Sequence, residues 1–225
     1  MALSLRSKHE ELQIQTVLFS TYKPINFSTY PLDMNDFGFY FTEGWKHIIS
    51  PDALDHQLFI LALAVVYTFK DWKKVLVLVT AFTIGHSLTL ALSVLDIIRI
   101  SSRWVEFLIP VTILVTALWN LLHGKPAQKV NANYFMALFF GLIHGMGFAS
   151  SIRMMLASDQ SLGWGLFGFN AGLEAGQVIV VLIILSASKL LTDIVKVPQR
   201  IYIFVILLAI FVFAAKMAIE RIPAF

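Results

Sequence analysis

Six ionisable residues lie within or at the edge of long apolar stretches, and they are the side chains of this chain best placed to do chemistry. They are three histidines and three acids: His56, His86, His144, Asp55, Glu106 and Glu174. A further histidine, His47, precedes the first of these stretches. Imidazole nitrogens bind nickel, cobalt, zinc and copper, and carboxylates can complete the coordination shell. Together, such residues could hold a divalent transition metal.

The composition places these residues in a membrane protein. Of 225 residues, 58% are hydrophobic and 14% are charged, and the mean hydropathy is +0.76. A soluble domain carries about 25% charged residues, so this chain has too little charge to cover a water-facing surface. The composition excludes a soluble enzyme, a disordered chain and a nucleic-acid-binding protein. The chain contains no cysteine, which excludes thiolate metal sites, iron–sulfur clusters and disulfides.

The apolar residues fall into six segments that could cross a bilayer as helices, each of which needs about 20 residues. Continuous apolar runs such as 178–185 lack the alternation of membrane β-strands. The sequence therefore predicts an all-α membrane protein, a bundle of about six transmembrane helices forming one domain over residues 34–225. The expected spans are Asp52–Phe69, Val75–Leu95, Trp104–Leu122, Tyr134–Leu156, Gly165–Ser188 and Ile201–Ile219.

The N-terminal segment differs from the rest of the chain. Residues 1–33 are mixed and polar and lack the order of a signal peptide, so we expect a weakly ordered leader or an upstream extension. The aromatic cluster from Phe37 to Trp45 predicts a short interfacial helix that leads into the bundle. Lysine and arginine collect in cytoplasmic loops, and their larger number at the ends of the spans near Lys70 and Lys189 predicts that both termini lie outside.

The predicted depths of the ionisable residues point to one side of the membrane. At about 1.5 Å per residue, Asp55, His56 and Glu106 would lie roughly 5 Å from the outer helix ends. On the same scale, His86 and Glu174 would lie about 13 Å deep and His144 about 20 Å deep. This distribution is typical of a funnel of ligands that opens outward.

Small and polar residues accompany these groups on the predicted helices. Gly168, Gly172 and Gly176 form overlapping GxxxG patterns, which allow close helix approach and are compatible with a homo-oligomer. Among the supporting polar residues, Asn170 and Gln177 share a helix face with Glu174, and Thr83 and Ser87 share a face that lies beside His86.

Four stretches of the sequence carry a family resemblance that covers residues 34 to about 188. They are Gly44–His47 with Leu54–His56, Thr80–Leu90, Gly141–Ala149 and Phe169–Gln177. With these stretches the chain resembles the HupE/UreJ family of bacterial membrane proteins, most closely the branch found outside hydrogenase and urease operons. The family's His and Asp-His motif maps to His47, Asp55 and His56, with a longer spacing than the commonest form.

The resemblance implies a function and a location. Family members are regarded as nickel or cobalt permeases, or as accessory proteins to nickel enzymes. It implies a multi-pass protein of the bacterial inner (cytoplasmic) membrane, and the count of basic residues given above then predicts that both termini lie in the periplasm. Its partners would be the lipid bilayer and a divalent metal ion, nickel or cobalt by resemblance, with zinc fitting the same ligands.

These observations together lead to one main hypothesis and two alternatives. We expect a transporter and no catalytic residue, with the ion bound from the outer side and with His47 and Glu106 at the entrance. The expected ligands are His56, His86, His144, Asp55 and Glu174. One alternative is an intramembrane zinc-dependent hydrolase acting on a lipid-like substrate, since Ser87 adjoins His86. The other is a non-transporting accessory protein in which the polar set only stabilises the bundle.

Overall fold

The computed structural model describes residues 34–123, 130–148, 152 and 162–223. The predicted leader and most of the fourth span beyond Phe148 lie outside this part of the chain. Within it, the chain is all-helical and contains no strand, as expected. The helices are α2 (Met34–Ile49), α3 (Leu54–Ala64), α4 (Trp72–Val94), α5 (Ser102–His123), α6 (Val130–Gly147), α8 (Leu162–Lys189) and α9 (Gln199–Glu220), and short helical turns cover Pro51–Ala53, Phe69–Asp71 and Leu190–Ile194.

Four helical segments are long and apolar enough to cross a membrane, which supports a membrane protein. They are Phe69–Val94, Ser102–His123, Gly163–Ile194 and Gln199–Glu220. The first predicted span differs most from the structure. Its helix, α3, has 11 residues and is roughly 16 Å long at the standard rise, about half of the hydrocarbon thickness. A single helix over Asp52–Phe69 was therefore a wrong prediction, because the helix ends at Ala64.

The N-terminal helix α2 packs tightly against α8. A Cβ atom at Gly44 would collide with the backbone carbonyl of Phe169, and one at Gly172 would collide with the carbonyl of Phe41. Tyr40 on α2 is completely buried. One face of α2 is thus part of the bundle interior, whereas the sequence predicted a helix at the membrane interface.

The GxxxG face of α8 is occupied within the chain. Gly168 lies against Phe37, and Gly176 lies against Ile48. The pattern therefore indicated a real close helix contact, as predicted. Because α2 covers this face, the pattern gives no support to a homo-oligomer.

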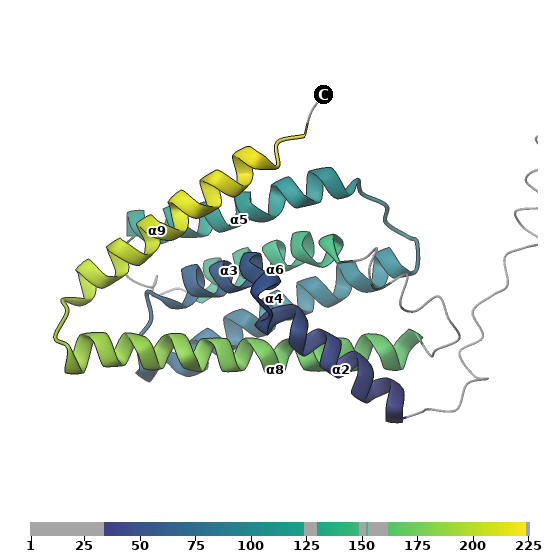
Figure 1. The fold of residues 1–225 in the computed structure, drawn as a ribbon, viewed down its shortest axis with the longest axis horizontal. Helices are drawn as coiled ribbons and strands as arrows, with labels where there is room; N and C mark the ends of the chain where they lie inside the picture. Colours follow the sequence, from purple (N-terminus) through teal and green to yellow (C-terminus); the bar gives the residue numbers. More distant parts are fainter. Residues whose placement is uncertain (1–33, 124–129, 149–151, 153–161, 224–225) are drawn as a thin grey trace, which may run out of the picture. The chain divides into compact units, whose positions relative to one another are not determined.

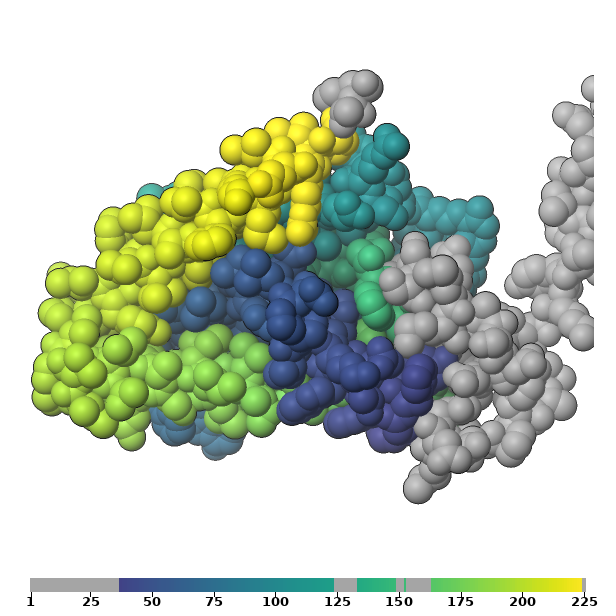
Figure 2. Space-filling model, viewed as in Figure 1, coloured from purple at the N-terminus to yellow at the C-terminus, as the bar shows by residue number. Residues whose placement is uncertain are grey.

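The helices α2 and α3 follow one another along α8. The contacts of Phe37 with Gly168 and of Ile48 with Gly176 show that α2 advances along α8 in the same direction. After the break at residues 50–53, α3 continues toward the end of the bundle where α5 ends (Figure 1). Figure 2 shows α2 and α3, in purple and blue, filling the strip between α8 in green and α9 in yellow. The break between them therefore lies partway along the bundle.

The helices α4 and α6 form a second close pair through glycine. A Cβ atom at Gly85 would collide with the carbonyl of Leu138, and one at Gly141 would collide with the carbonyl of Phe82. Each contact is with backbone, which cannot move aside as a flexible side chain can. This approach brings His86 of α4 and His144 of α6 into the same part of the interior, where both are buried.

We predict that Gly172→Ala destabilises the protein by about 1–3 kcal/mol, the usual cost of overpacking. The added methyl group would collide with the backbone of α2. Thermal unfolding in detergent measures the effect as a lower Tm.

The matched control is Gly38→Ala on α2, where an added Cβ meets nothing within 4 Å. This variant should be as stable as the wild type or gain up to about 1 kcal/mol, because alanine favours helix over glycine. Equal Tm values for the two variants would contradict the packing described here.

Candidate metal centre

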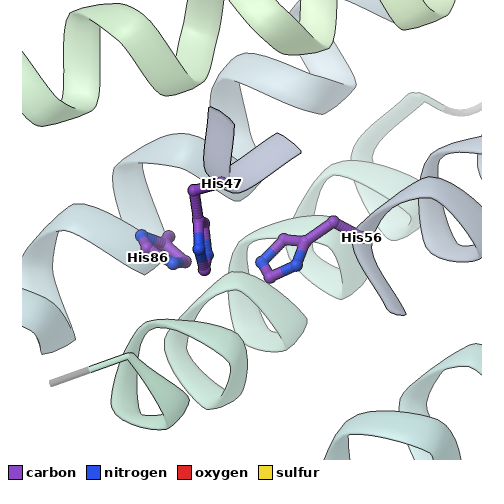
Figure 3. Close-up of side chains that lie close together, drawn as sticks. All are labelled: His47, His56 and His86. Atoms are coloured by element: carbon purple, nitrogen blue, oxygen red, sulfur yellow. The ribbon is translucent and has the colours of Figure 1, made fainter. Parts of the chain in front are cut away.

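Three histidines from three helices meet in the interior of the bundle. One nitrogen from each of His47, His56 and His86 lies within 4.8 Å of the others. The ring centroids of His47 and His56 are 4.6 Å apart, and His86 is 5.9 Å from each of them. Figure 3 shows the ring of His47 between the other two. Such a group can offer three imidazole ligands to one metal ion.

A fourth histidine adjoins this group. The His144 ring centroid lies 5.1 Å from that of His56, and His144 is almost fully buried. Its Nε2 atom lies 3.0 Å from the Thr112 hydroxyl oxygen on α5. A hydrogen bond to one ring nitrogen orients an imidazole ring. His144 is therefore held beside the three-histidine group by a contact that the sequence did not predict.

Several of the imidazole nitrogens are buried and have no hydrogen-bond partner in the described part of the chain. They are His47 Nε2, His56 Nε2, His86 Nδ1, His86 Nε2 and His144 Nδ1. Leaving a buried polar atom unsatisfied costs about 1–3 kcal/mol. Packing alone gives no compensation for this cost, whereas a bound ion or water would.

Aromatic rings enclose the imidazoles. Phe148 lies 4.1 Å from His47 between ring centroids, and Phe169 stacks on His86 at 6.4 Å. On the other side, Phe82 lies 5.0 Å from His144. These apolar rings lower the local dielectric beside the imidazoles, which strengthens any interaction between the nitrogens and a cation.

A cavity of about 410 Å³ adjoins the histidines. Its lining includes His47, His56 and His144 together with the carboxylates of Asp52, Asp55 and Glu106. Asp55 forms an ion pair with Arg221 at the end of α9, at 3.0 Å, and its second oxygen is buried without a partner. Glu106 is exposed and lies in the same lining. The cavity thus joins the imidazoles to negative charge.

Glu174 and the predicted supporting residues make contacts apart from the three-histidine group and its cavity. Thr80 donates a 2.6 Å hydrogen bond to Glu174, and Thr83 donates to Gln177 at 2.8 Å, so these pairs join α4 to α8. Neither the three-histidine group nor the cavity lining includes Glu174. The two remaining supporting residues donate hydrogen bonds within their own helices. Ser87 donates to the Thr83 carbonyl, and Asn170 donates to the Leu166 carbonyl.

The depth of His56 differs from the depth expected from the sequence. His56 was placed roughly 15 Å nearer the surface than His144 by helix rise, yet their rings are 5.1 Å apart. The estimate assumed that the first span begins at Asp52 on the membrane surface. In the structure, α2 precedes α3 along α8. His56 therefore lies farther from the end of the bundle than the sequence predicted.

Two residues of the site were not found from the sequence. Gln57 donates hydrogen bonds to the carbonyls of Ile48 and Ser50, at 3.0 and 2.9 Å. These carbonyls lie where the helix is interrupted between His47 and His56, so Gln57 stabilises the interruption. Arg221 pairs with Asp55 across 166 positions of sequence. Gln57 could have been noticed because it follows the Asp-His pair directly. No sequence signal links Arg221 to the site.

We predict that Gln57→Leu lowers the free energy of unfolding by about 1–3 kcal/mol, because it removes the donor to two carbonyls at the helix break. The measurement is thermal unfolding in detergent. The exposed Gln199 at the start of α9 provides the control variant Gln199→Leu, which should unfold close to the wild-type Tm. A Gln57→Leu protein as stable as this control would contradict the role given to Gln57.

Comparison with known proteins is consistent with this centre. Among curated proteins and among solved structures, no match to the chain was found. The family model described as HupE / UreJ protein matches residues 27–221, which include every helix described above. The chain therefore belongs to the HupE/UreJ family.

Proposed function

We propose that this protein is a permease for a divalent transition metal, nickel or cobalt. One observation carries the proposal: three imidazoles from separate helices converge within 4.8 Å beside a cavity that also holds carboxylates. Membership of the HupE/UreJ family supports transition-metal handling. Imidazole with carboxylate suits Ni(II) and Co(II), and zinc fits the same ligands.

In this proposal the cavity is the entrance and the histidines are the binding site. Glu106 and Asp55 attract the hydrated ion, and His47, His56 and His86 replace part of its water shell. His144 completes or adjoins the shell. Neutral imidazoles with one or two acids compensate the charge of the ion without a large excess of either sign. Mixed coordination also allows release, which a closed cage of four protein ligands would slow.

We further propose that six spans cross the membrane. The four segments with span length account for α4, α5, α8 and α9, α6 is the fifth, and α2 with α3 together form a discontinuous sixth. Broken helices at membrane depth are found where they line a cavity, and transporters use such breaks to bind ions. With six spans, both termini lie on one side, the periplasm by the count of basic residues, in the bacterial inner membrane.

A zinc-dependent hydrolase is the second candidate, because three histidines beside an open cavity also suit an activated zinc-bound water. Ser87, the residue next to His86, donates to the Thr83 carbonyl of its own helix at 2.7 Å and is absent from the cavity lining. Zinc that stays bound in a one-to-one ratio through purification and dialysis would favour the hydrolase over transport.

We predict that His86→Ala weakens Ni²⁺ binding at least about tenfold, since even the loss of a residue that hydrogen-bonds to a metal ligand costs about 10–100-fold in affinity. Calorimetric titration of the purified protein in detergent measures the affinity. The matched control is His123→Ala, whose ring is exposed at the end of α5 and bonded to the Trp119 carbonyl. That variant should bind Ni²⁺ as the wild type does.

Two results would contradict the proposal. One is equal Ni²⁺ affinity for His86→Ala and the wild type. The other is normal affinity without Ni²⁺ entry into vesicles that contain the wild-type protein, which would favour the accessory role. If the histidines only stabilise the bundle, His86→Ala should change Tm and leave the metal content unchanged.

A further inference from the structure

A line of buried polar side chains continues from the histidines toward the opposite end of the bundle. It consists of Thr112, Thr116 and Asn120 on α5, spaced four residues apart and therefore on one helix face. Their exposed fractions are 3%, 0% and 7%. These three buried polar residues form a stripe along one face of α5.

The stripe begins at the metal centre. The Thr112 hydroxyl is 3.0 Å from His144 Nε2 and also donates to the Ile109 carbonyl. Thr116 donates to the Thr112 carbonyl at 2.8 Å. Each hydroxyl oxygen keeps a lone pair that could contact a cation. The first member of the stripe, Thr112, is thus in direct contact with His144, which adjoins the three-histidine group.

The stripe ends at a second cavity, of about 400 Å³. Asn120 lines this cavity with His123 and Arg200, where α5 ends and α9 begins. The Asn120 amide also donates to the Ala62 carbonyl of α3 at 2.8 Å. The polar residues of α5 therefore link the cavity beside the histidines to a cavity at the other end of the bundle.

The two cavities differ in charge. Asp52, Asp55 and Glu106 contribute three carboxylates to the first cavity, beside Arg221. The second has a histidine and an arginine, and no acid is among those of its lining residues that the structure describes. A divalent cation is attracted at the acidic end, and at the basic end it finds no anionic ligand to retain it. This asymmetry favours capture at one end and release at the other.

We propose that the ion leaves the histidines along Thr112, Thr116 and Asn120 and emerges in the cavity lined by His123 and Arg200. This inference rests on the proposed transport function and names the second half of its route. Threonines in membrane helices commonly bond to their own backbone, as these do. The contact of Thr112 with His144 and the position of Asn120 in a cavity wall distinguish this stripe from ordinary backbone-bonded threonines.

The test uses the full-length protein in lipid vesicles that contain a Ni²⁺-sensitive dye, together with calorimetric Ni²⁺ titration in detergent. Thr116→Val removes the hydroxyl and keeps the side-chain shape. We expect its rate of Ni²⁺ entry to fall at least about tenfold while its Ni²⁺ affinity stays within about twofold of the wild type. Thr116→Ser restores the hydroxyl and should recover most of the rate.

The matched control is Thr192→Val. Thr192 donates to the Ser188 carbonyl four residues earlier, as Thr116 does on α5, but it lines a different cavity. Its rate of Ni²⁺ entry should be normal. A lower rate in Thr192→Val than in Thr116→Val would place the exit at that other cavity and overturn the proposal.

The failures of the route and of transport can be told apart. Normal Ni²⁺ entry in both the wild type and Thr116→Val would overturn the route alone. No Ni²⁺ entry with the wild type would overturn the transport function and the route with it. A Thr116→Val protein that loses affinity and rate together, without recovery in Thr116→Ser, would assign Thr116 a structural role and overturn the route.

Discussion

The energetic cost of unsatisfied imidazole nitrogens in an apolar interior is the constraint on which this structure depends. Five such nitrogens, from four histidines, are buried without a partner among the described residues. At about 1–3 kcal/mol each, this is a large burden for a protein whose net stability is typically 5–15 kcal/mol. A water molecule or a cation bound among these nitrogens would offset that cost, and imidazole is a common ligand of divalent transition metals.

Glycine is what allows the histidines to meet. The backbones of α2 and α8 approach so closely at Gly44 and Gly172 that no side chain fits between them, and α4 and α6 do the same at Gly85 and Gly141. The first pair places His47 of α2 in the bundle, and the second brings His86 of α4 and His144 of α6 together. The break after α2 then turns the chain so that His56 of α3 comes beside His47. The geometry of the site therefore depends directly on the close packing of these helices.

Much of this could be predicted from the sequence, and the exceptions have physical reasons. Apolar runs predicted the long helices, and ionisable residues within them predicted the histidine group, because both signals are local. The position of α2 could not be predicted in this way, since its aromatic face suits a membrane interface as well as the groove of α8. Its contact with α8 depends on Gly44, which is not part of the GxxxG pattern on α8.

The remaining differences come from long-range contacts. Arg221 pairs with Asp55 across the whole chain, and single-sequence periodicity carries no information about such a partner. Glu174 was predicted as a ligand because its depth on a straight helix overlaps that of the histidines. It accepts a hydrogen bond from Thr80, and its role as a ligand stays a prediction. Depth along a helix fixes the level of a side chain, whereas its direction around the axis decides which neighbours it meets. On α5, Thr112 and Thr116 gave no signal of their own in the sequence, since threonines in membrane helices commonly bond to their own backbone.

X-ray absorption spectroscopy of the Ni²⁺-loaded protein tests the central claim most directly, because it reports the ligands of the ion itself. The account predicts a nitrogen and oxygen shell with the outer-shell scattering typical of about three imidazole rings, in agreement with the three-histidine group. A shell of oxygen ligands alone, without imidazole scattering, would place the ion elsewhere and contradict the account.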